Sequence, residues 1–332
     1  MEGRLCKLRL SVYETMNNNI FEQLVSPETG RLLKQNSHYL STEDESEVFQ
    51  IKNGIACLLQ SGTLDEAQTH EIKVFDNLHI RDTSYFRASF LKKITDKIHS
   101  VLNDGSKRGR GSFVVVEMGG GEGHWARSIK KDNPNAAVFV CDLSMKTLER
   151  VPRDLKRVCA DVTQPIFENG SVQVVSFWVS LHHLEAKNRK TALRRVFEAL
   201  ADEGLLLVFE PNNTFWPRRM MYKTRLAKDV YPDDKEQGVD FSEISETAKS
   251  IGFVEVGTYF MNPPYNPEFV KKLRRWFVYL PAVEFLYQIE RWVLTPIFGD
   301  IFSEKQSKLK KYLSLYGLSI YRKGRMEREV YG

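Results

Sequence analysis

The fold of this chain is decided by one stretch, Phe113-Val114-Val115-Val116-Glu117-Met118-Gly119-Gly120-Gly121-Glu122-Gly123-His124-Trp125. Four apolar residues lead to an acid, and glycines then occupy positions 119, 121 and 123. This order predicts a buried parallel strand, a tight turn and the start of a helix. Glycine lacks a Cβ, so a ligand can approach the backbone of the turn. The amides at the helix N-terminus favour a polar or anionic ligand group.

Two classes of cofactor use glycine turns of this kind. The nicotinamide and flavin fingerprint G-x-G-x-x-G, counted from Gly119, would require glycine where His124 stands. The spacing G-x-G-x-G after a strand that ends in an acid instead resembles motif I of the class I S-adenosylmethionine (SAM) methyltransferases. The resemblance implies that Glu117, Gly119, Gly121 and Gly123 hold the amino-acid end of SAM.

Strand and helix patterns alternate after this stretch. Further strands are predicted at 138–142, 172–178, 204–211, 254–260 and 318–322, with helices at 144–151, 187–201 and 241–251. Such alternation predicts the α/β class and a doubly wound, mostly parallel sheet. The family resemblance, which is good over residues 113–211, implies a sheet of seven strands.

Three other strand ends add to the expected cofactor site, because open α/β sheets bind ligands at the carboxyl edge. Asp142, followed by Leu143, ends the second strand, where a carboxylate can accept both ribose hydroxyls. Asp161 and Val162 resemble the segment whose acid accepts a hydrogen bond from the adenine amino group. Trp178 begins the segment that this family places beside the transferred methyl. For each acid taken alone, an ordinary structural cap is the alternative interpretation.

Two adjacent histidines are the candidate bases. His182 and His183 follow the strand that ends at Trp178, and Glu210 ends the next strand. A hydroxyl or ammonium acceptor must lose a proton, and histidine titrates in the useful range. Small-molecule methyltransferases with a similar Ser-Leu-His-His segment use this region together with an acid in the position of Glu210. We therefore expect His182 or His183 to act as the base, with Glu210 orienting the imidazole or the substrate.

A helical pattern in residues 66–111 leads into the motif strand and ends in a polar, basic loop at 104–111. Tyr85 and Arg87 lie on this lead-in. In similar methyltransferases an aromatic residue or an arginine there lines the mouth of the cofactor site, so both are candidate cofactor residues. Simple packing is the alternative.

Residues 1–65 predict a small β-rich unit in which residues 48–59 form two strands joined by an Asn-Gly turn. The unit resembles the Trm112-like modules that precede or accompany some methyltransferases. Those modules often carry a Cys-Pro-x-Cys zinc knuckle, and here Ser26 and Thr29 stand at the two cysteine positions. A metal-free structural or docking unit is therefore expected.

Two insertions extend the expected core of residues 112–262. One is residues 212–239, and the other is an aromatic segment at 263–314, which precedes the last strand and tail at 315–332. We interpret them as a helical cap that encloses an organic substrate and excludes water. A homodimer interface through the 263–314 helices is the main alternative, and a helix on a membrane surface is a third.

Composition sets few further limits. The chain has 332 residues, 42% hydrophobic residues, a net charge of +5 and four cysteines without a C-x-x-C pair. These values favour an ordinary globular protein without a zinc ribbon or a disulfide framework. No signal-peptide pattern occurs at the N-terminus, and the longest apolar stretch, 276–302, is interrupted by charged residues and prolines. A cytoplasmic location is expected.

The predicted function is SAM-dependent methyl transfer to oxygen or nitrogen of a small or medium organic substrate, in specialised metabolism. A tRNA or protein methyltransferase is the leading alternative. The Asn-Pro-Pro-Tyr tetrad typical of planar-nitrogen methylation occurs at residues 262–265, after the predicted sixth strand rather than the fourth. A non-catalytic, SAM-binding partner subunit is the third possibility.

Overall fold

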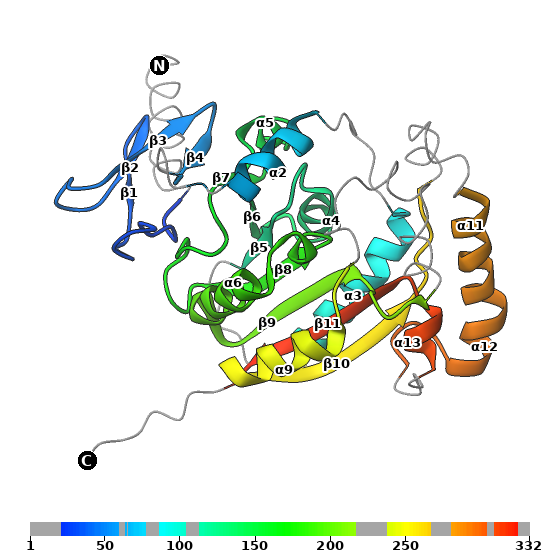
Figure 1. Cartoon of the computed structure of the whole chain (residues 1–332). Helices are drawn as coiled ribbons and strands as arrows, with labels where there is room; N and C mark the ends of the chain where they lie inside the picture. Colours follow the sequence, from blue (N-terminus) through cyan, green and yellow to red (C-terminus); the bar gives the residue numbers. More distant parts are fainter. Residues whose placement is uncertain are drawn as a thin grey trace, which may run out of the picture.

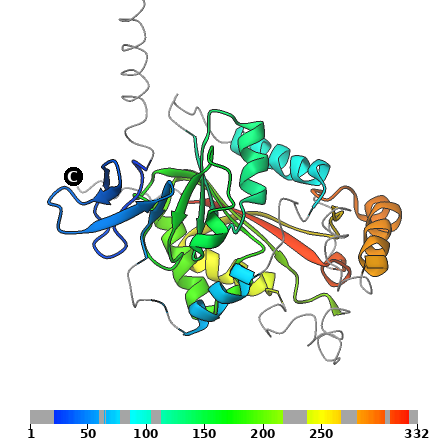
Figure 2. The same cartoon turned by 90° about the horizontal axis from the view of Figure 1, so that it is seen from above.

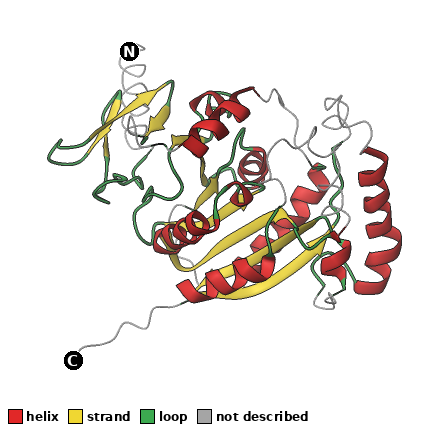
Figure 3. Cartoon of the chain, viewed as in Figure 1, coloured by secondary structure: helices red, strands yellow, loops and turns green. Residues whose placement is uncertain are grey.

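One mixed β-sheet runs through the part of the chain that the computed structural model describes, residues 21–59, 64, 66–77, 86–103, 113–216, 238–266, 280–303 and 309–324. Helices cover both faces of the sheet (Figures 1 and 3). The strand order is β1-β2-β3-β4-β7-β6-β5-β8-β9-β11-β10. The strands are β1 (Lys34–Gln35), β2 (Tyr39–Ser41), β3 (Val48–Lys52), β4 (Ile55–Cys57), β5 (Val114–Met118), β6 (Ala137–Asp142), β7 (Lys156–Cys159), β8 (Val172–Trp178), β9 (Leu200–Pro211), β10 (Phe253–Met261) and β11 (Tyr316–Lys323).

The motif strand β5 lies at the point where the strand order reverses. Strands β6 and β7 continue on one side of it and β8 and β9 on the other, all in parallel pairing. Strand β11 then pairs antiparallel with β9 and β10. A ligand of such a sheet binds beyond the carboxyl end of the strands at the reversal, which here is the glycine turn.

Two apolar layers hold the helices against the sheet. Alternate residues of each central strand face opposite sides, so Val114 and Val116 join one buried cluster and Val115 joins the other. The first cluster includes residues of α6 and α9, and the second includes residues of α3 and α4. The helices are α2 (Glu66–Asn77), α3 (Ala88–Asn103), α4 (His124–Asp132), α5 (Met145–Leu148), η1 (Leu181–His183), α6 (Ala186–Ala199), α9 (Phe241–Ile251), α11 (Leu280–Ile289), η4 (Glu290–Leu294), α12 (Thr295–Phe298) and α13 (Lys310–Leu313).

The sheet is larger than the seven strands expected. Among the described residues it has eleven, because the N-terminal strands β1–β4 join it through parallel pairing of β4 with β7. The predicted turn between β3 and β4 is present, and Asn53 and Gly54 both have positive φ. The N-terminal strands therefore extend one edge of the main sheet, as Figures 1 and 2 show.

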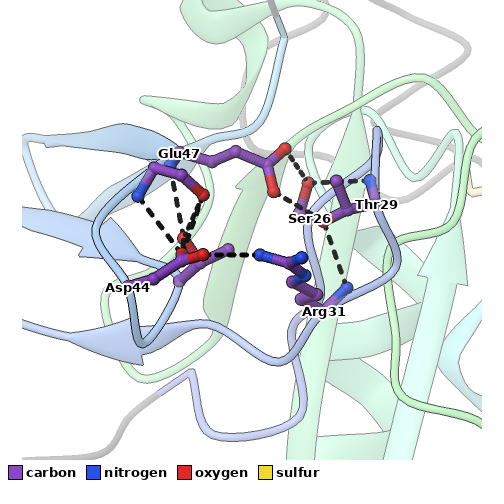
Figure 4. A network of polar contacts seen from close by, with 7 residues as sticks. Ser26, Thr29, Arg31, Asp44 and Glu47 are labelled. Atoms are coloured by element: carbon purple, nitrogen blue, oxygen red, sulfur yellow. Dashed lines mark hydrogen bonds and ion pairs between the residues drawn. The ribbon is translucent and has the colours of Figure 1, made fainter.

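A carboxylate links Ser26 and Thr29, the two residues compared above with the cysteine positions of a zinc knuckle (Figure 4). The Ser26 hydroxyl donates to Glu47 Oε1 and the Thr29 hydroxyl donates to Glu47 Oε2, each at 2.5 Å. Ser26 Oγ also accepts from the backbone N–H groups of Glu28 and Thr29. Hydroxyl–carboxylate hydrogen bonds thus connect this loop to the strand region that follows it.

Helical elements α11, η4 and α12 follow one another without a break over residues 280–298, at the end of the molecule opposite β1–β4 (Figures 1 and 2). No described helix combines the length and apolar composition needed to cross a bilayer. Several parts of the predicted caps lie outside the described residues, namely 217–237, 267–279 and 304–308. The same holds for the whole basic loop, residues 104–111.

Candidate functional site

A cleft opens at the carboxyl ends of β5, β6 and β8, where the sequence predicts the cofactor. Seven of the predicted residues contribute to its wall: Gly119, Gly121, Asp142, Leu143, Val162, Trp178 and His183. Residues that were not predicted complete the lining: Ile72, Gly120, Glu122, His124, Ser144, Thr147, Arg150, Phe177, Val179, Ser180 and Leu184.

The glycine turn forms the floor of this cleft. Gly119 and Gly121 have φ of 63° and 53°, a region that residues with a Cβ rarely adopt. A Cβ on Gly119 would lie 2.7 Å from Cβ of Ser180, so glycine is also required there by space. A Cβ on Gly121 would meet only Thr147, at 3.9 Å, because the space beside it is the open cleft. The backbone is therefore accessible to a ligand.

Glu117 supports the turn from below and does not line the cleft. Its side chain is buried, and Oε2 accepts a hydrogen bond from the N–H of Ala126 in the first turn of α4. Burial raises the pKa of Glu117 to about 8, although the N–H groups of Ala126 and Trp125 partly oppose the rise. Gly123, the residue before α4, is likewise outside the wall. Both residues shape the turn.

Asp142 lies on the wall where the ribose is expected. Its two carboxylate oxygens accept hydrogen bonds from the N–H groups of Gly121 and Ser144, each at 2.9 Å. Burial raises its pKa and these N–H groups lower it, with a net upward shift. A carboxylate oxygen has two lone pairs, so the capacity to accept ribose hydroxyls remains. The arrangement fits a ribose beside the glycine turn.

Asp161 is hydrogen-bonded to helix α2, and no pattern in the sequence indicates that this helix lies at the cleft. Its Oδ2 accepts from Gln68 Nε2 of α2 at 2.7 Å, and its Oδ1 accepts from the backbone N–H and hydroxyl of Thr163. Ile72, one turn further along α2, lines the cleft. The predicted adenine-binding acid is thus near the cleft but paired with α2, which covers this end.

Aromatic rings back the cleft at the end of β8. Trp178 lines the wall and stacks on Phe209 of β9, with ring centroids 4.2 Å apart and planes 21° from parallel. Trp125 of α4 lies parallel to Trp178 at 6.0 Å. The wall beside the expected methyl group is therefore rigid and apolar, which excludes water there.

Glu210 anchors the turn that follows Trp178. Val179 has φ of 57°, which is strained for a β-branched residue, and the N–H groups of the next two residues point to one carboxylate oxygen. Ser180 N–H and Leu181 N–H donate to Glu210 Oε1 at 2.8 and 2.6 Å. The carboxylate offsets the strain of this turn and fixes the residues that follow.

The two histidines have different surroundings. His182 is fully buried, and its Nδ1 lies 2.6 Å from Glu210 Oε2, which is also buried. His183 lines the cleft. The two rings are in contact, with centroids 4.0 Å apart and planes tilted by 38°. Glu210 therefore orients His182 directly, and only His183 belongs to the cleft wall.

Part of the chain is similar to known proteins. Residues 115–204 match the model of a family described as "Methyltransferase domain". The chain contains a SAM-dependent methyltransferase domain. A curated relative, Methyltransferase str3 of Strobilurus tenacellus, is 33% identical over 95 residues, which are 28% of this chain and 34% of that protein. The match thus spans about a third of the relative's length.

Solved structures similar to the chain include methyltransferases. The geranyl diphosphate C-methyltransferase of Streptomyces coelicolor A3(2) is 12% identical with a TM-score of 0.50, over 78% of this chain and 98% of that one. Phosphoethanolamine N-methyltransferase 2 of Haemonchus contortus is 17% identical with a TM-score of 0.43, over 69% of this chain and 53% of that one. The first of these supports the fold of the methyltransferase domain. SAM is accordingly the cofactor of the domain, and the open glycine turn and Asp142 fit it.

The two predicted cofactor residues of the lead-in have different outcomes. Tyr85 lies outside the described residues, so its prediction stays untested. Arg87 does not line the cleft, because its guanidinium contacts Tyr265 O at 3.2 Å, Glu284 at 3.6 Å and the ring of Tyr287. Arg87 instead joins the start of α3 to α11.

The charged residues at the other end of the cleft were missed by sequence reasoning. Glu122 and His124 lie 3.9 Å apart, and Arg150 reaches Glu122 at 3.4 Å. Glu122 and His124 are polar residues within and directly after the glycine motif, so the sequence could have identified them as candidate site residues. Arg150 reaches the cleft from the turn after α5, and no local sequence pattern indicates this contact.

Proposed function

We propose that the chain transfers the methyl group of SAM to an oxygen or nitrogen of a small or medium organic acceptor, with His183 as the base. The placement of His183 on the cleft wall, backed by the buried His182–Glu210 pair, carries this proposal. Specialised metabolism is the proposed setting, supported by the match to a fungal methyltransferase. A cytoplasmic location stays a prediction.

The residues divide into a cofactor part and an acceptor part. In the proposal, the glycine turn and Glu122 hold the amino-acid end, Asp142 the ribose, and Val162 with Ile72 the adenine. SAM supplies an electrophilic methyl group on a sulfonium. The protein's contribution is mainly in-line positioning of the acceptor, which the rigid Trp178 wall supports.

Proton removal is assigned to His183. The imidazole of His183 would take the proton of an acceptor hydroxyl as its oxygen attacks the methyl carbon. From an ammonium acceptor it would remove the proton first, because only the neutral amine has a lone pair. The electron pair of the broken methyl–sulfur bond would leave with S-adenosylhomocysteine. His182 is a positioning residue, because its ring lies against His183 and its Nδ1 is held by Glu210. The Glu210 carboxylate also accepts hydrogen bonds from the backbone N–H groups of Ser180 and Leu181. One buried group therefore fixes the conformation of the segment that carries both histidines.

The tetrad typical of base or glutamine methylation lies away from this cleft. Asn262 follows β10, as the predicted strand count requires, and it is buried against Glu290 and the backbone of Leu313. This placement gives no support to a tRNA or protein acceptor. A non-catalytic, SAM-binding partner subunit is the remaining alternative, and an activity measurement distinguishes it from an enzyme.

Substitution of each histidine tests the proposal. Methyl transfer from labelled SAM to a panel of phenols, alcohols and amines is measured for the wild type, His183→Ala and His182→Asn. We expect kcat of His183→Ala to fall by about 10²–10⁴-fold, the typical contribution of a general base. S-adenosylhomocysteine (SAH) affinity should stay within about twofold, since the proposal assigns His183 to the acceptor and His182 to positioning, and neither to the cofactor.

The control is His99→Ala, because His99 pairs with Asn133 away from the cleft. His182→Asn should lower kcat less than His183→Ala and shift the pH dependence of kcat, as expected of a positioning residue. Wild-type turnover in both cleft variants, with SAH affinity intact, would sink the assignment of the base. Tight SAH binding without turnover of any acceptor would favour the partner-subunit alternative.

A further inference from the structure

Two cysteines face each other where the N-terminal strands join the central sheet. Strand β4 pairs in parallel with β7, and Cys57 of β4 is the register partner of Cys159 of β7. Register partners on neighbouring strands carry their side chains on the same face of the sheet, with the backbones about 4.8 Å apart. Cys159 belongs to the second apolar cluster, and Cys57 packs against the same cluster. The two thiols therefore lie side by side, although they are far apart in the sequence.

This arrangement permits a disulfide without a rearrangement of the two strands. Disulfides usually join residues whose Cα atoms are about 4.4 to 6.8 Å apart, a range that includes paired residues of neighbouring strands. Both cysteines are free thiols in the structure. Cys141, the third described cysteine, belongs to the first apolar cluster and so faces the other side of the sheet. Cys6 lies outside the described residues.

The surroundings of the pair make Cys57 the more reactive thiol. A hydrogen bond from the Cys159 thiol lowers the pKa of Cys57, partial burial opposes this, and the Leu59 N–H and the Lys52 charge lower the pKa further. The Cys57 sulfur, burial and the charge of Asp142 together raise the pKa of Cys159. The thiolate is the reactive form of cysteine, and reactive cysteines are partly exposed. Cys57 is half-buried and Cys159 is buried, so an oxidant reaches Cys57 first.

Cys159 also contacts the wall of the cofactor cleft. It is the register partner of Asp142 on β6, the residue proposed to hold the ribose. Its thiol can donate to the backbone oxygen of Leu143, which lies 3.4 Å away and lines the cleft. Only the protonated sulfur is a donor, so a disulfide at Cys159 would leave this oxygen without that hydrogen bond. Oxidation of the pair therefore alters the wall at Leu143.

We propose that Cys57 and Cys159 form a site of reversible oxidation by peroxides, which closes a disulfide and weakens binding of SAM. The Cys57 thiolate attacks hydrogen peroxide, an S–O bond forms as the O–O bond breaks, and hydroxide leaves. The Cys159 sulfur then attacks the resulting sulfenic acid, the S–S bond forms, and the hydroxyl group leaves with the Cys159 proton as water. Counting the proton that Cys57 gives up at the start, two thiols and one peroxide become a disulfide and two waters.

Peptide mapping by mass spectrometry tests the disulfide. The reduced full chain is treated with hydrogen peroxide, the remaining thiols are alkylated, and the digest is analysed without reduction. We expect a linked pair of peptides that contains Cys57 and Cys159 and that dithiothreitol separates. Cys141→Ala is the matched control, because Cys141 is a buried cysteine of the neighbouring strand β6, and it should form the same linkage. Cys159→Ser should instead leave a sulfenic acid on Cys57, which dimedone labels.

Calorimetric titration with SAH tests the effect on the cofactor, which rests on the cofactor site proposed above. The peroxide-treated wild type should bind SAH at least about threefold more weakly than the reduced protein, the loss expected when one hydrogen bond in the wall is broken. Dithiothreitol should restore the affinity. Cys57→Ser cannot close the disulfide, so peroxide should leave its SAH affinity unchanged. This variant also controls for oxidation of methionines.

Absence of the Cys57–Cys159 linkage, while the same peroxide oxidises added glutathione, overturns the proposal. A linkage that uses Cys6 or Cys141 instead also overturns it. A disulfide that leaves SAH affinity unchanged contradicts the effect on the cofactor. Failure of the reduced wild type to bind SAH overturns the proposed cofactor site, whereas the mapping still decides the disulfide because it needs no ligand. The thermal midpoint of each reduced variant checks its folding, and the wild-type mapping requires no substitution.

Discussion

Glu117 illustrates how a single residue of the motif serves the site from behind. The sequence indicated an acid at the strand end and predicted a cofactor contact. The structure instead buries its carboxylate under the glycine turn, where it accepts an N–H of α4. The pattern of an acid before glycines was readable because it is local. The direction of its side chain depends on the packing of α4, so it could not be predicted from the sequence.

The buried carboxyl predicts a pH dependence of stability. The folded-state pKa of Glu117 is about 8, above its ordinary value of 4.5, so between these values the folded protein keeps a proton that the unfolded chain releases. This group therefore makes the free energy of unfolding fall as pH rises from about 5 to 8, by at most about 1.4 kcal/mol per pH unit. Glu117→Gln keeps an acceptor for the Ala126 N–H and removes that contribution.

Urea unfolding at several pH values measures the effect. The difference in unfolding free energy between Glu117→Gln and the wild type should grow in favour of the variant from pH 5 to pH 8. Glu246→Gln, at an exposed position of α9, is the control and should leave the slope unchanged. Parallel stability curves for Glu117→Gln and the wild type would contradict the assignment.

Glu210 shows the same limit of sequence-based prediction for the proposed catalytic segment. Its position at the end of β9 predicted a partner for one histidine, and the structure places it against His182. Its two bonds to the amides of Ser180 and Leu181, and the positive φ of Val179, follow from a turn that no pattern in the sequence indicates. Residue type and strand end were predictable, but which histidine contacts Glu210 and which lines the cleft required the fold.

Among the elements, α2 departs most from what the sequence suggests. It was expected only as a lead-in, yet Ile72 lines the cleft and Gln68 donates to Asp161. Asp76 near its end accepts from the hydroxyl of Ser144, which follows Asp142. The contacts are polar and come from residues about 70 to 90 positions away in the chain. Local periodicity cannot reveal such an arrangement.

The contact between Gln68 and Asp161 predicts a role for α2 in cofactor retention. Gln68→Glu places a second carboxylate where the amide now donates, and repulsion should displace α2 from the adenine end. Loss of one hydrogen bond to a charged group is worth about 1.5–3 kcal/mol, so the Kd for SAH should rise roughly tenfold. Calorimetric titration measures this, with Gln50→Glu at an exposed position of β3 as control. Unchanged affinity in Gln68→Glu would show that α2 does not retain the cofactor.

At the scale of the whole molecule, the central α/β sheet was predictable and its extension was not. Apolar runs such as 113–116 and 204–208 identify buried strands by composition and length. Pairing of β4 with β7 joins residues about 100 positions apart, and only the fold reveals it. The N-terminal strands were predicted as a separate unit for that reason, and their hairpin at Asn53-Gly54 was nevertheless readable because turns are local.

The whole molecule therefore combines a methyltransferase domain with a cleft built from its strand ends, and the proposed site has SAM beside Asp142. Calorimetric titration with SAH tests this most directly, using the wild type, Asp142→Asn and a matched control. The control is Asp240→Asn, because Asp240 likewise accepts a backbone N–H, at the start of α9 and away from the cleft.

We expect one saturable site in the wild type and in Asp240→Asn. We expect at least about tenfold weaker binding in Asp142→Asn, because hydrogen bonds from the ribose to a charged group are lost. No saturable binding to the wild type, or equal affinity in a folded Asp142→Asn, would contradict the account.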